Sequence, residues 1–181
     1  NGVMAQPLTG TTLSNFAYLI QQSSTAEVVQ WFDDVKSAGL GFAAGNADAM
    51  RRVCAGDYDW CFTDTDDAAK AVVNGYPVAI HYLDQGMGES GAMLIPNSIC
   101  LIEGAQQNEM AKKFIDYVVS AECELRLAHS TSAQIPLHRG ITVPDGIQLP
   151  HRDYPVLDIP WEAVAAELDG AASTFQELFV R

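Results

Sequence analysis

The stretch Val3-Met4-Ala5-Gln6-Pro7-Leu8-Thr9-Gly10-Thr11-Thr12 decides the fold, because it joins a strand to a helix through a short polar turn. Residues 3–5 form an apolar run that is typical of a short strand. Apolar side chains then recur at helical spacing, at Leu13, Phe16, Leu19 and Ile20. The turn places hydroxyl and backbone N–H groups at a helix N-terminus, where the helix dipole favours negative charge.

Strands and helices continue to alternate through the first half of the chain. The sequence predicts further strands at 40–43, 60–62 and 77–82. The helices between them are marked by the capping box Ser24-Thr25-Ala26-Glu27, by Asn46 as an N-cap, and by a stop at Asn74-Gly75. This alternation is typical of an α/β layer with a mostly parallel sheet.

Polar residues follow three of the predicted strands, at Thr9, Asn46 and Asp64. In parallel α/β sheets, ligands bind at the carboxyl ends of the strands. We therefore expect these three positions to face one crevice.

The second half of the chain is less regular. Strands are expected at 92–95 and 98–102, and helices are expected to start at the caps Asn108 and Ser120. Residues 130–160 show little periodicity and predict a long connection. Pro160 opens a last helix, whose apolar face comprises Trp161, Val164, Leu168, Phe175 and Leu178.

Composition limits the class of protein. The chain has 181 residues, of which 48% are hydrophobic, so it can bury a sizeable core. Ten Lys and Arg against 23 Asp and Glu, a net charge of −13, argue against a nucleic-acid partner and against an anionic membrane surface. No apolar run has the length of a membrane-spanning helix, so we expect the chain as given to be soluble. Asn1 need not be the native start, and a removed leader stays compatible with the sequence.

The cysteines do not decide between disulfides and free thiols. Cys54, Cys61, Cys100 and Cys123 lack the C-x-x-C spacing of a structural zinc site. Their even number is compatible with disulfides in an exported protein, and their apolar surroundings are compatible with free buried thiols. The sequence leaves both alternatives open.

The acidic run Asp64, Asp66, Asp67 is the sharpest local signal. One interpretation is that one carboxylate caps a helix and the others complement its dipole. A second is a site of carboxylate oxygens for a hard cation or a polar ligand. A third is a metal-dependent phosphatase-like enzyme that uses Asp64 and Asp66 as nucleophile and general acid, although Ala68 stands where such enzymes have Thr or Val. No nucleophile elbow, dinucleotide fingerprint or P-loop is present.

The order of motifs resembles the extracytoplasmic solute-binding proteins of ABC importers, in the branch usually called iron(III)-binding. The resemblance covers nearly the whole chain, and it rests on the order and spacing of short motifs. These are Thr9-Gly10-Thr11-Thr12, Ala44-Gly45-Asn46, Thr63-Asp64-Thr65-Asp66-Asp67-Ala68, Ile95-Pro96-Asn97, Ala111-Lys112-Lys113-Phe114-Ile115-Asp116-Tyr117, Ser120-Ala121-Glu122, Gln134-Ile135-Pro136-Leu137 and Asp158-Ile159-Pro160-Trp161.

This resemblance implies a two-lobed clamshell of the type II periplasmic-binding-protein fold, with a three-layer α/β lobe. Residues 1–90 and 137–181 would build the second lobe, and 91–136 would belong to a first lobe that is mostly missing. A small solute would be captured in the cleft and delivered to a membrane permease, outside the cytoplasm. The truncated chain would expose apolar surface and would tend to self-associate.

The resemblance also implies a set of binding residues. Thr9, Gly10, Thr11 and Thr12 match a turn that holds a phosphate or carbonate anion, and Asn46 matches an Asn in the shell of that anion. Asp66 and Asp67 stand where the relatives have two iron-binding tyrosines, so no tyrosinate-iron site is present.

Two kinds of ligand stay open. One is ferric iron or another cation at Asp66 and Asp67, together with a synergistic anion. The other is a small polar organic solute bound by Asp64, Asp66, Asn46, Tyr82 and Asp84. Because the site has acceptors without a positioned base and nucleophile, we expect a binding protein and no enzyme.

Overall fold

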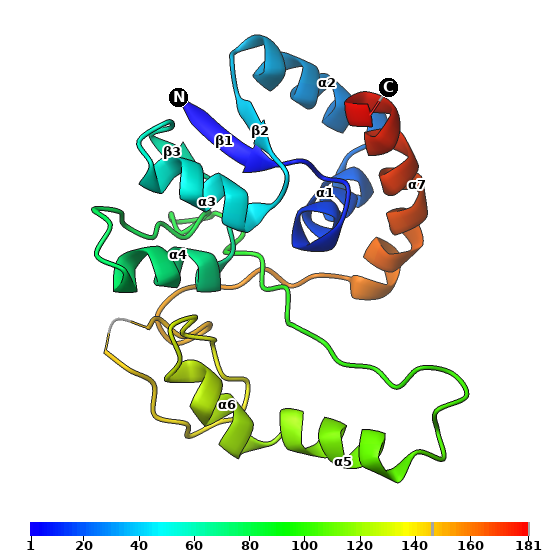
Figure 1. Cartoon of the computed structure of the whole chain (residues 1–181). Helices are drawn as coiled ribbons and strands as arrows, with labels where there is room; N and C mark the ends of the chain where they lie inside the picture. The colour runs from blue at the N-terminus through cyan, green and yellow to red at the C-terminus, as the bar shows by residue number, and fades with distance from the viewer. Residues whose placement is uncertain (146, 181) are drawn as a thin grey trace. The chain divides into compact units, whose positions relative to one another are not determined.

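The computed structural model describes residues 1–145 and 147–180, which form three strands and seven helices (Figure 1). The chain divides into two compact units. Unit 1 comprises Asn1–Ile80 and Leu157–Arg181, and unit 2 comprises His81–Val156. The lobes implied by the resemblance, 1–90 with 137–181 and 91–136, stay a prediction.

Unit 1 is built on a parallel sheet with the strand order β2-β1-β3. The central strand β1 (Gly2–Ala5) pairs with β2 (Gly41–Ala43) on one side and with β3 (Trp60–Cys61) on the other. All residues of β1 are buried, as expected for a parallel strand that is covered on both faces. The predicted α/β class with a parallel sheet is confirmed.

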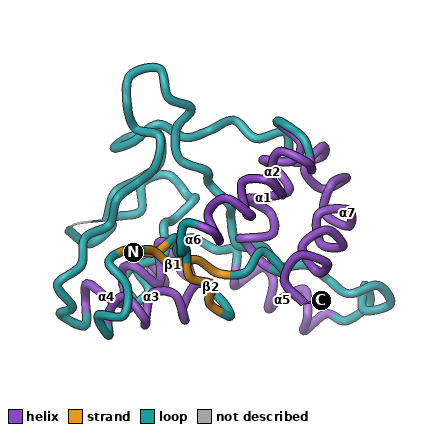
Figure 2. Tube along the Cα trace, turned by 90° about the horizontal axis from the view of Figure 1, so that it is seen from above, coloured by secondary structure: helices purple, strands orange, loops and turns teal. Residues whose placement is uncertain are grey.

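Three helices cover one face of this sheet: α1 (Gly10–Gln22), α2 (Thr25–Ser37) and α7 (Trp161–Val180) (Figures 1 and 2). An aromatic cluster holds them together. Phe32 is its centre and is fully buried, with its ring 5.3 Å from that of Phe175. It also packs on the rings of Phe16, Trp31, Phe42 and Phe179.

The opposite face is covered by α3 (Asn46–Cys54), with α4 (Thr65–Val73) packed beside it. Val3, Ala43 and Ala49 form the buried centre of this layer. The two alanines let α3 approach the sheet closely, because neither presents more than a methyl group. The helix–sheet–helix layering follows from this distribution of large side chains on one face and small ones on the other.

The strand expected at 60–62 forms over Trp60 and Cys61 only. Its apolar composition is typical of a buried strand, but it lies at the edge of the sheet, where Trp60 is 46% exposed and the following Phe62 is 38% exposed. A Cβ on Gly2 would lie 2.2 Å from the Trp60 ring, so the indole lies directly over the backbone of β1.

The strands expected at 77–82, 92–95 and 98–102 are not present. A strand exists only where its backbone pairs with a neighbour. Across these segments, the described residues contain a single isolated bridge, between Ala92 and Val156. Apolar composition alone therefore gave the wrong prediction.

Unit 2 contains α5 (Glu109–Val118) and α6 (Ala121–Ala128). Both begin as predicted, since the side chains of Asn108 and Ser120 accept backbone N–H bonds of the first turn. The described part of 130–160 contains no helix or strand, which confirms the predicted long connection. None of the helices described in either unit combines the length and apolar character needed to cross a membrane.

Candidate functional site

Three helices of unit 1 begin where the three parallel strands end. α1 follows β1, α3 follows β2 and α4 follows β3, so all three N-termini lie at the carboxyl edge of the sheet. The residues at their N-cap positions are Thr9, Gly45 and Asp64, and none of them makes a side-chain bond to the first turn of its own helix. By contrast, α2, α5 and α6 are each capped by a Ser or Asn side chain.

A hydrogen-bonded group, the polar network, joins the three N-termini; it comprises Thr11, Thr12, Asn46, Thr63 and Asp64. The amide of Asn46 donates to Asp64 Oδ2 at 2.8 Å and to Thr11 Oγ1 at 3.0 Å. The hydroxyl of Thr11 donates to Asp64 Oδ1 at 3.0 Å, and that of Thr12 donates to Asn46 Oδ1 at 3.1 Å. Thr63 donates to the backbone oxygen of Asn46 at 3.2 Å. Residues far apart in the sequence are thereby held at one place. Asn46 and Asp64 meet as expected, whereas Thr11 and Thr12, and not Thr9, represent the first turn in this network.

The carboxylate of Asp64 gives this network its charge. α1 has no acidic residue in its own first turn, and the bond from Thr11 brings the Asp64 carboxylate to that turn. Negative charge at a helix N-terminus is stabilising. Both carboxylate oxygens of Asp64 accept bonds from other helices, so the prediction that the acidic run caps α4 with a side chain is wrong for this residue.

Asn46 also differs from its prediction. The N-cap of α3 is Gly45, with an extended backbone at φ −173°, and Asn46 is the first helical residue. This position frees the Asn46 side chain to reach α1 and α4. Near the start of α3, the side chain that accepts a backbone hydrogen bond is Asp48. Its carboxylate accepts from the N–H of Ala44 at 3.3 Å. That bond, aided by Arg52 and Arg51, lowers the pKa of the Asp48 carboxyl.

Asp66 and Asp67 lie in the first turn of α4 and share a cation from their own helix. The ammonium of Lys70 lies 3.0 Å from Asp66 Oδ2 and 3.2 Å from Asp67 Oδ1. These bonds, the one from Asp66 first, raise the pKa of Lys70. Asp64, Asp66 and Asp67 can each offer a carboxylate oxygen within 4.8 Å of the others, which is the spacing of a candidate cation site.

Sequence reasoning missed Lys70. The signal was available, because Lys70 is four residues after Asp66 and three after Asp67, and residues at these spacings meet on a helix surface. Thr63 was also missed as a member of the network. Its position two residues after the end of β3 carried no pattern that would distinguish it.

The remaining predicted residues fall in two places. Thr9 and Gly10 are exposed at the start of α1, where Gly10 has a positive φ of 64°. Tyr82 and Asp84 belong to unit 2, where Tyr82 stacks on Tyr154 with ring centroids 4.2 Å apart. Of the predicted residues, the structure therefore brings together Thr11, Thr12, Asn46 and Asp64, with Asp66 and Asp67 beside Asp64. The participation of Thr9, Gly10, Tyr82 and Asp84 stays a prediction.

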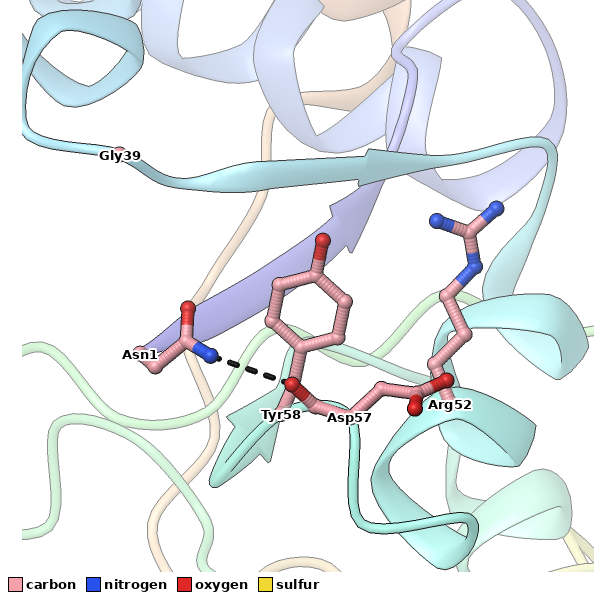
Figure 3. Close-up of a pocket in the computed structure, with 5 residues that line it drawn as sticks. All are labelled: Asn1, Gly39, Arg52, Asp57 and Tyr58. Atoms are coloured by element: carbon pink, nitrogen blue, oxygen red, sulfur yellow. Dashed lines mark hydrogen bonds between the residues drawn. The ribbon is translucent and has the colours of Figure 1, made fainter.

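A surface hollow lies at the opposite, amino-terminal edge of the sheet (Figure 3). It is lined by Asn1, Gly39, Arg52, Asp57 and Tyr58. The Asn1 amide donates to the backbone oxygen of Asp57 at 3.1 Å, and Arg52 is paired with Asp48 at 3.0 Å. The Asn1 amide and the Arg52 guanidinium therefore already have partners, and none of the lining residues belongs to the predicted site.

No family model matches the chain, and a search of the curated proteins also gives no match.

Proposed function

We propose that this chain is the substrate-binding component of an ABC importer, built on the type II periplasmic-binding-protein plan. It would act outside the cytoplasm, capture a small solute and deliver it to a membrane permease. The observation that carries the proposal is the difference in helix capping. The helices that start at the carboxyl edge have no side-chain cap, whereas α2, α5 and α6 do.

Uncapped first turns supply backbone N–H donors, which suit an oxygen atom or an anionic group of a ligand. The carboxylates of Asp66 and Asp67 supply the opposite chemistry. In the structure they hold the ammonium of Lys70, which shows the kind of group their geometry accepts. A ligand with both a positive group and an oxygen acceptor can bind the carboxylates through the first and the backbone N–H groups through the second.

Two ligands have this character. One is an organic solute that carries an ammonium group together with a carboxylate or hydroxyl. The other is a metal cation, ferric iron included, bound by Asp66 and Asp67 with a phosphate or carbonate at residues 9–12. A simple anion is disfavoured, because the Asp64 carboxylate already lies beside the N-terminus of α1.

The test is a thermal-shift panel on the full chain, with ferric iron with and without phosphate, divalent metals, amino acids, polyamines and neutral sugars. A ligand at a hundred times its dissociation constant stabilises the folded state by about 2.7 kcal/mol. We expect a shift from one member that carries positive charge. We expect that shift to be lost in Asp66→Asn and Asp67→Asn, and to be retained in Asp33→Asn, an exposed carboxylate on α2.

Lys70→Met gives a second, opposite readout. Removing the ammonium frees both carboxylates, so a cationic ligand no longer competes with Lys70 and is expected to bind more tightly. A panel in which no positively charged compound stabilises the wild type or Lys70→Met would refute the proposal. A shift that survives Asp66→Asn and Asp67→Asn would move the ligand away from this site.

A further inference from the structure

The outer edge of β3 is the side that faces away from β1. β3 is last in the strand order, with β1 as its only neighbour in the sheet that the described residues form. Phe62 donates its N–H to Val3 at 3.2 Å, and Cys61 is the register partner of Val3. In a parallel pair, alternate residues direct their N–H and C=O to opposite sides. The backbone groups of Cys61 therefore face the open edge.

The side chains around this edge are apolar and exposed. Trp60 of β3 and Phe62, the residue that follows β3, have ring centroids 5.4 Å apart in an edge-to-face arrangement. Both residues are more than one-third exposed, although Trp60 belongs to the central sheet. An exposed strand edge with large apolar side chains is a template for another strand.

The charges flanking β3 indicate which kind of strand fits. Asp57 and Asp59 precede it, and Asp64, Asp66 and Asp67 follow it, so five carboxylates lie within eleven residues. Asp59 is 3.1 Å from the N-terminal ammonium and its side chain is still 78% exposed. Pairing with a second copy would bring like charges together, which is unfavourable. A strand with basic residues at both ends meets complementary charge.

We propose that β3 is a docking edge for an extended peptide segment of a partner protein, apolar at its centre and basic at its ends. The segment adds a fourth strand to the sheet of unit 1. Its backbone bonds to the N–H and C=O of Cys61, its central side chains cover Trp60 and Phe62, and its basic ends face the flanking carboxylates. Asp64, Asp66 and Asp67 flank both this edge and the candidate site. The backbone pairing at Cys61 uses none of their side chains, so the inference does not depend on the proposed function.

The probe is a fluorescein-labelled peptide of the sequence Lys-Lys-Val-Tyr-Val-Lys-Lys, titrated by fluorescence anisotropy into the full chain at low and at high salt. We expect saturable binding that weakens as salt is added, because exposed charges are screened. The same peptide with N-methylated central residues cannot donate backbone hydrogen bonds. It is expected to bind about fivefold more weakly for each bond lost.

Two variants test the protein side. Cys61→Pro removes the outward N–H and leaves the bonds to β1 intact; proline is tolerated at strand edges. It should weaken the wild-type peptide about fivefold. Replacing Asp57 and Asp59 by Asn should reduce the salt dependence, and Asp33→Asn, on α2, should leave binding unchanged. Circular dichroism confirms that each variant is folded.

Three outcomes overturn the inference. One is the absence of saturable binding up to about 1 mM peptide, a limit that corresponds to roughly −4 kcal/mol. Another is equal affinity for the methylated and the unmethylated peptide, which would mean that backbone hydrogen bonds contribute nothing to binding. The third is sedimentation showing a dimer that Cys61→Pro abolishes and the peptide cannot dissociate, which would make a second copy the occupant.

Discussion

Replacing Asn46 by Ala removes the side chain on which the polar network depends. Asn46 makes two donor bonds, to Asp64 at 2.8 Å and to Thr11 at 3.0 Å, and accepts one from Thr12 at 3.1 Å. All three bonds are partly buried. The Cβ remains in place, so α3 keeps its contact with the sheet, and the change isolates the hydrogen bonds.

The expected destabilisation follows from these three bonds. A neutral hydrogen bond contributes about 1 kcal/mol to stability, and one to an ionised carboxylate contributes about 2 kcal/mol. Two effects reduce the loss. Water can reach the partners that remain, since the network is only partly buried, and Ala is a better helix former than Asn by roughly 0.5 kcal/mol. We therefore expect the free energy of unfolding to fall by about 2 kcal/mol.

Urea unfolding followed by tryptophan fluorescence measures this change. All three tryptophans, Trp31, Trp60 and Trp161, belong to unit 1, so the signal reports the unit that contains the network. The matched control is Asn15→Ala on α1, which makes the same chemical change outside the network. It should alter the free energy of unfolding by less than about 0.5 kcal/mol.

A double-mutant cycle provides the decisive comparison. Thr11→Val and Asn46→Ala remove two groups that bond to each other and to Asp64, so their effects should be non-additive by about 1 kcal/mol. If Asn46→Ala proves no more destabilising than Asn15→Ala, or if the cycle is additive, the network does not hold the three N-termini together.

Three further predictions concern other parts of the chain. Phe32→Ala should lower the free energy of unfolding by about 3–5 kcal/mol, because it empties the centre of the aromatic cluster; urea unfolding measures it. Burial raises the pKa of Glu124, but hydrogen bonds from His138 and Leu137 outweigh it and hold that pKa below its usual value. Glu124 therefore stabilises unit 2 above its unfolded pKa, and this contribution is lost as pH falls through the folded pKa; amide exchange around α6 between pH 6 and 3 detects it. Burial, with smaller effects of Tyr82 and Asp153, raises the pKa of Tyr154 to about 12. The folded state then favours the neutral phenol, a stabilisation present below the unfolded pKa of about 10 and lost as pH rises through about 12; absorbance titration should show this tyrosine ionising late.

Each of these has a control. Phe114→Ala removes an exposed ring on α5 and should have little effect, so a Phe32→Ala loss below 1 kcal/mol would contradict the packing argument. Glu124→Gln should flatten the acid dependence around α6, and an unchanged profile would show that another carboxyl is responsible. Tyr154→Phe should remove the late step from the alkaline titration; a late step that persists belongs to a different tyrosine.

The elements whose signals are local were predictable from sequence. The capping residues Ser24, Asn108 and Ser120 each accept a backbone N–H at the helix start where the sequence placed them. The stop at residues 74–75 is also correct, since α4 ends at Val73. These signals involve residues within a few positions of one another, so no tertiary information is needed.

The absence of strands at 77–82, 92–95 and 98–102 was not predictable, because strand formation depends on a partner that the sequence pattern does not identify. The site was predictable in outline, as Thr11, Asn46 and Asp64 all follow strands of one parallel sheet. The exact role of Asn46 was not. An Asn at a helix start is ordinarily a cap, and only the packing of α3 against β1 and β2 places its side chain toward Asp64 instead.

The position of α7 in the sequence has a consequence for how the protein is made. Phe175 and Phe179 complete the aromatic cluster around Phe32, yet they are synthesised after the whole of unit 2. At about 5–20 residues per second, the ribosome needs roughly 4–15 s to translate unit 2 alone. During that interval Phe16 and Phe32 lack their covering helix. A nascent chain that is stalled or cleaved before α7 therefore exposes these aromatic side chains to chaperones and proteases.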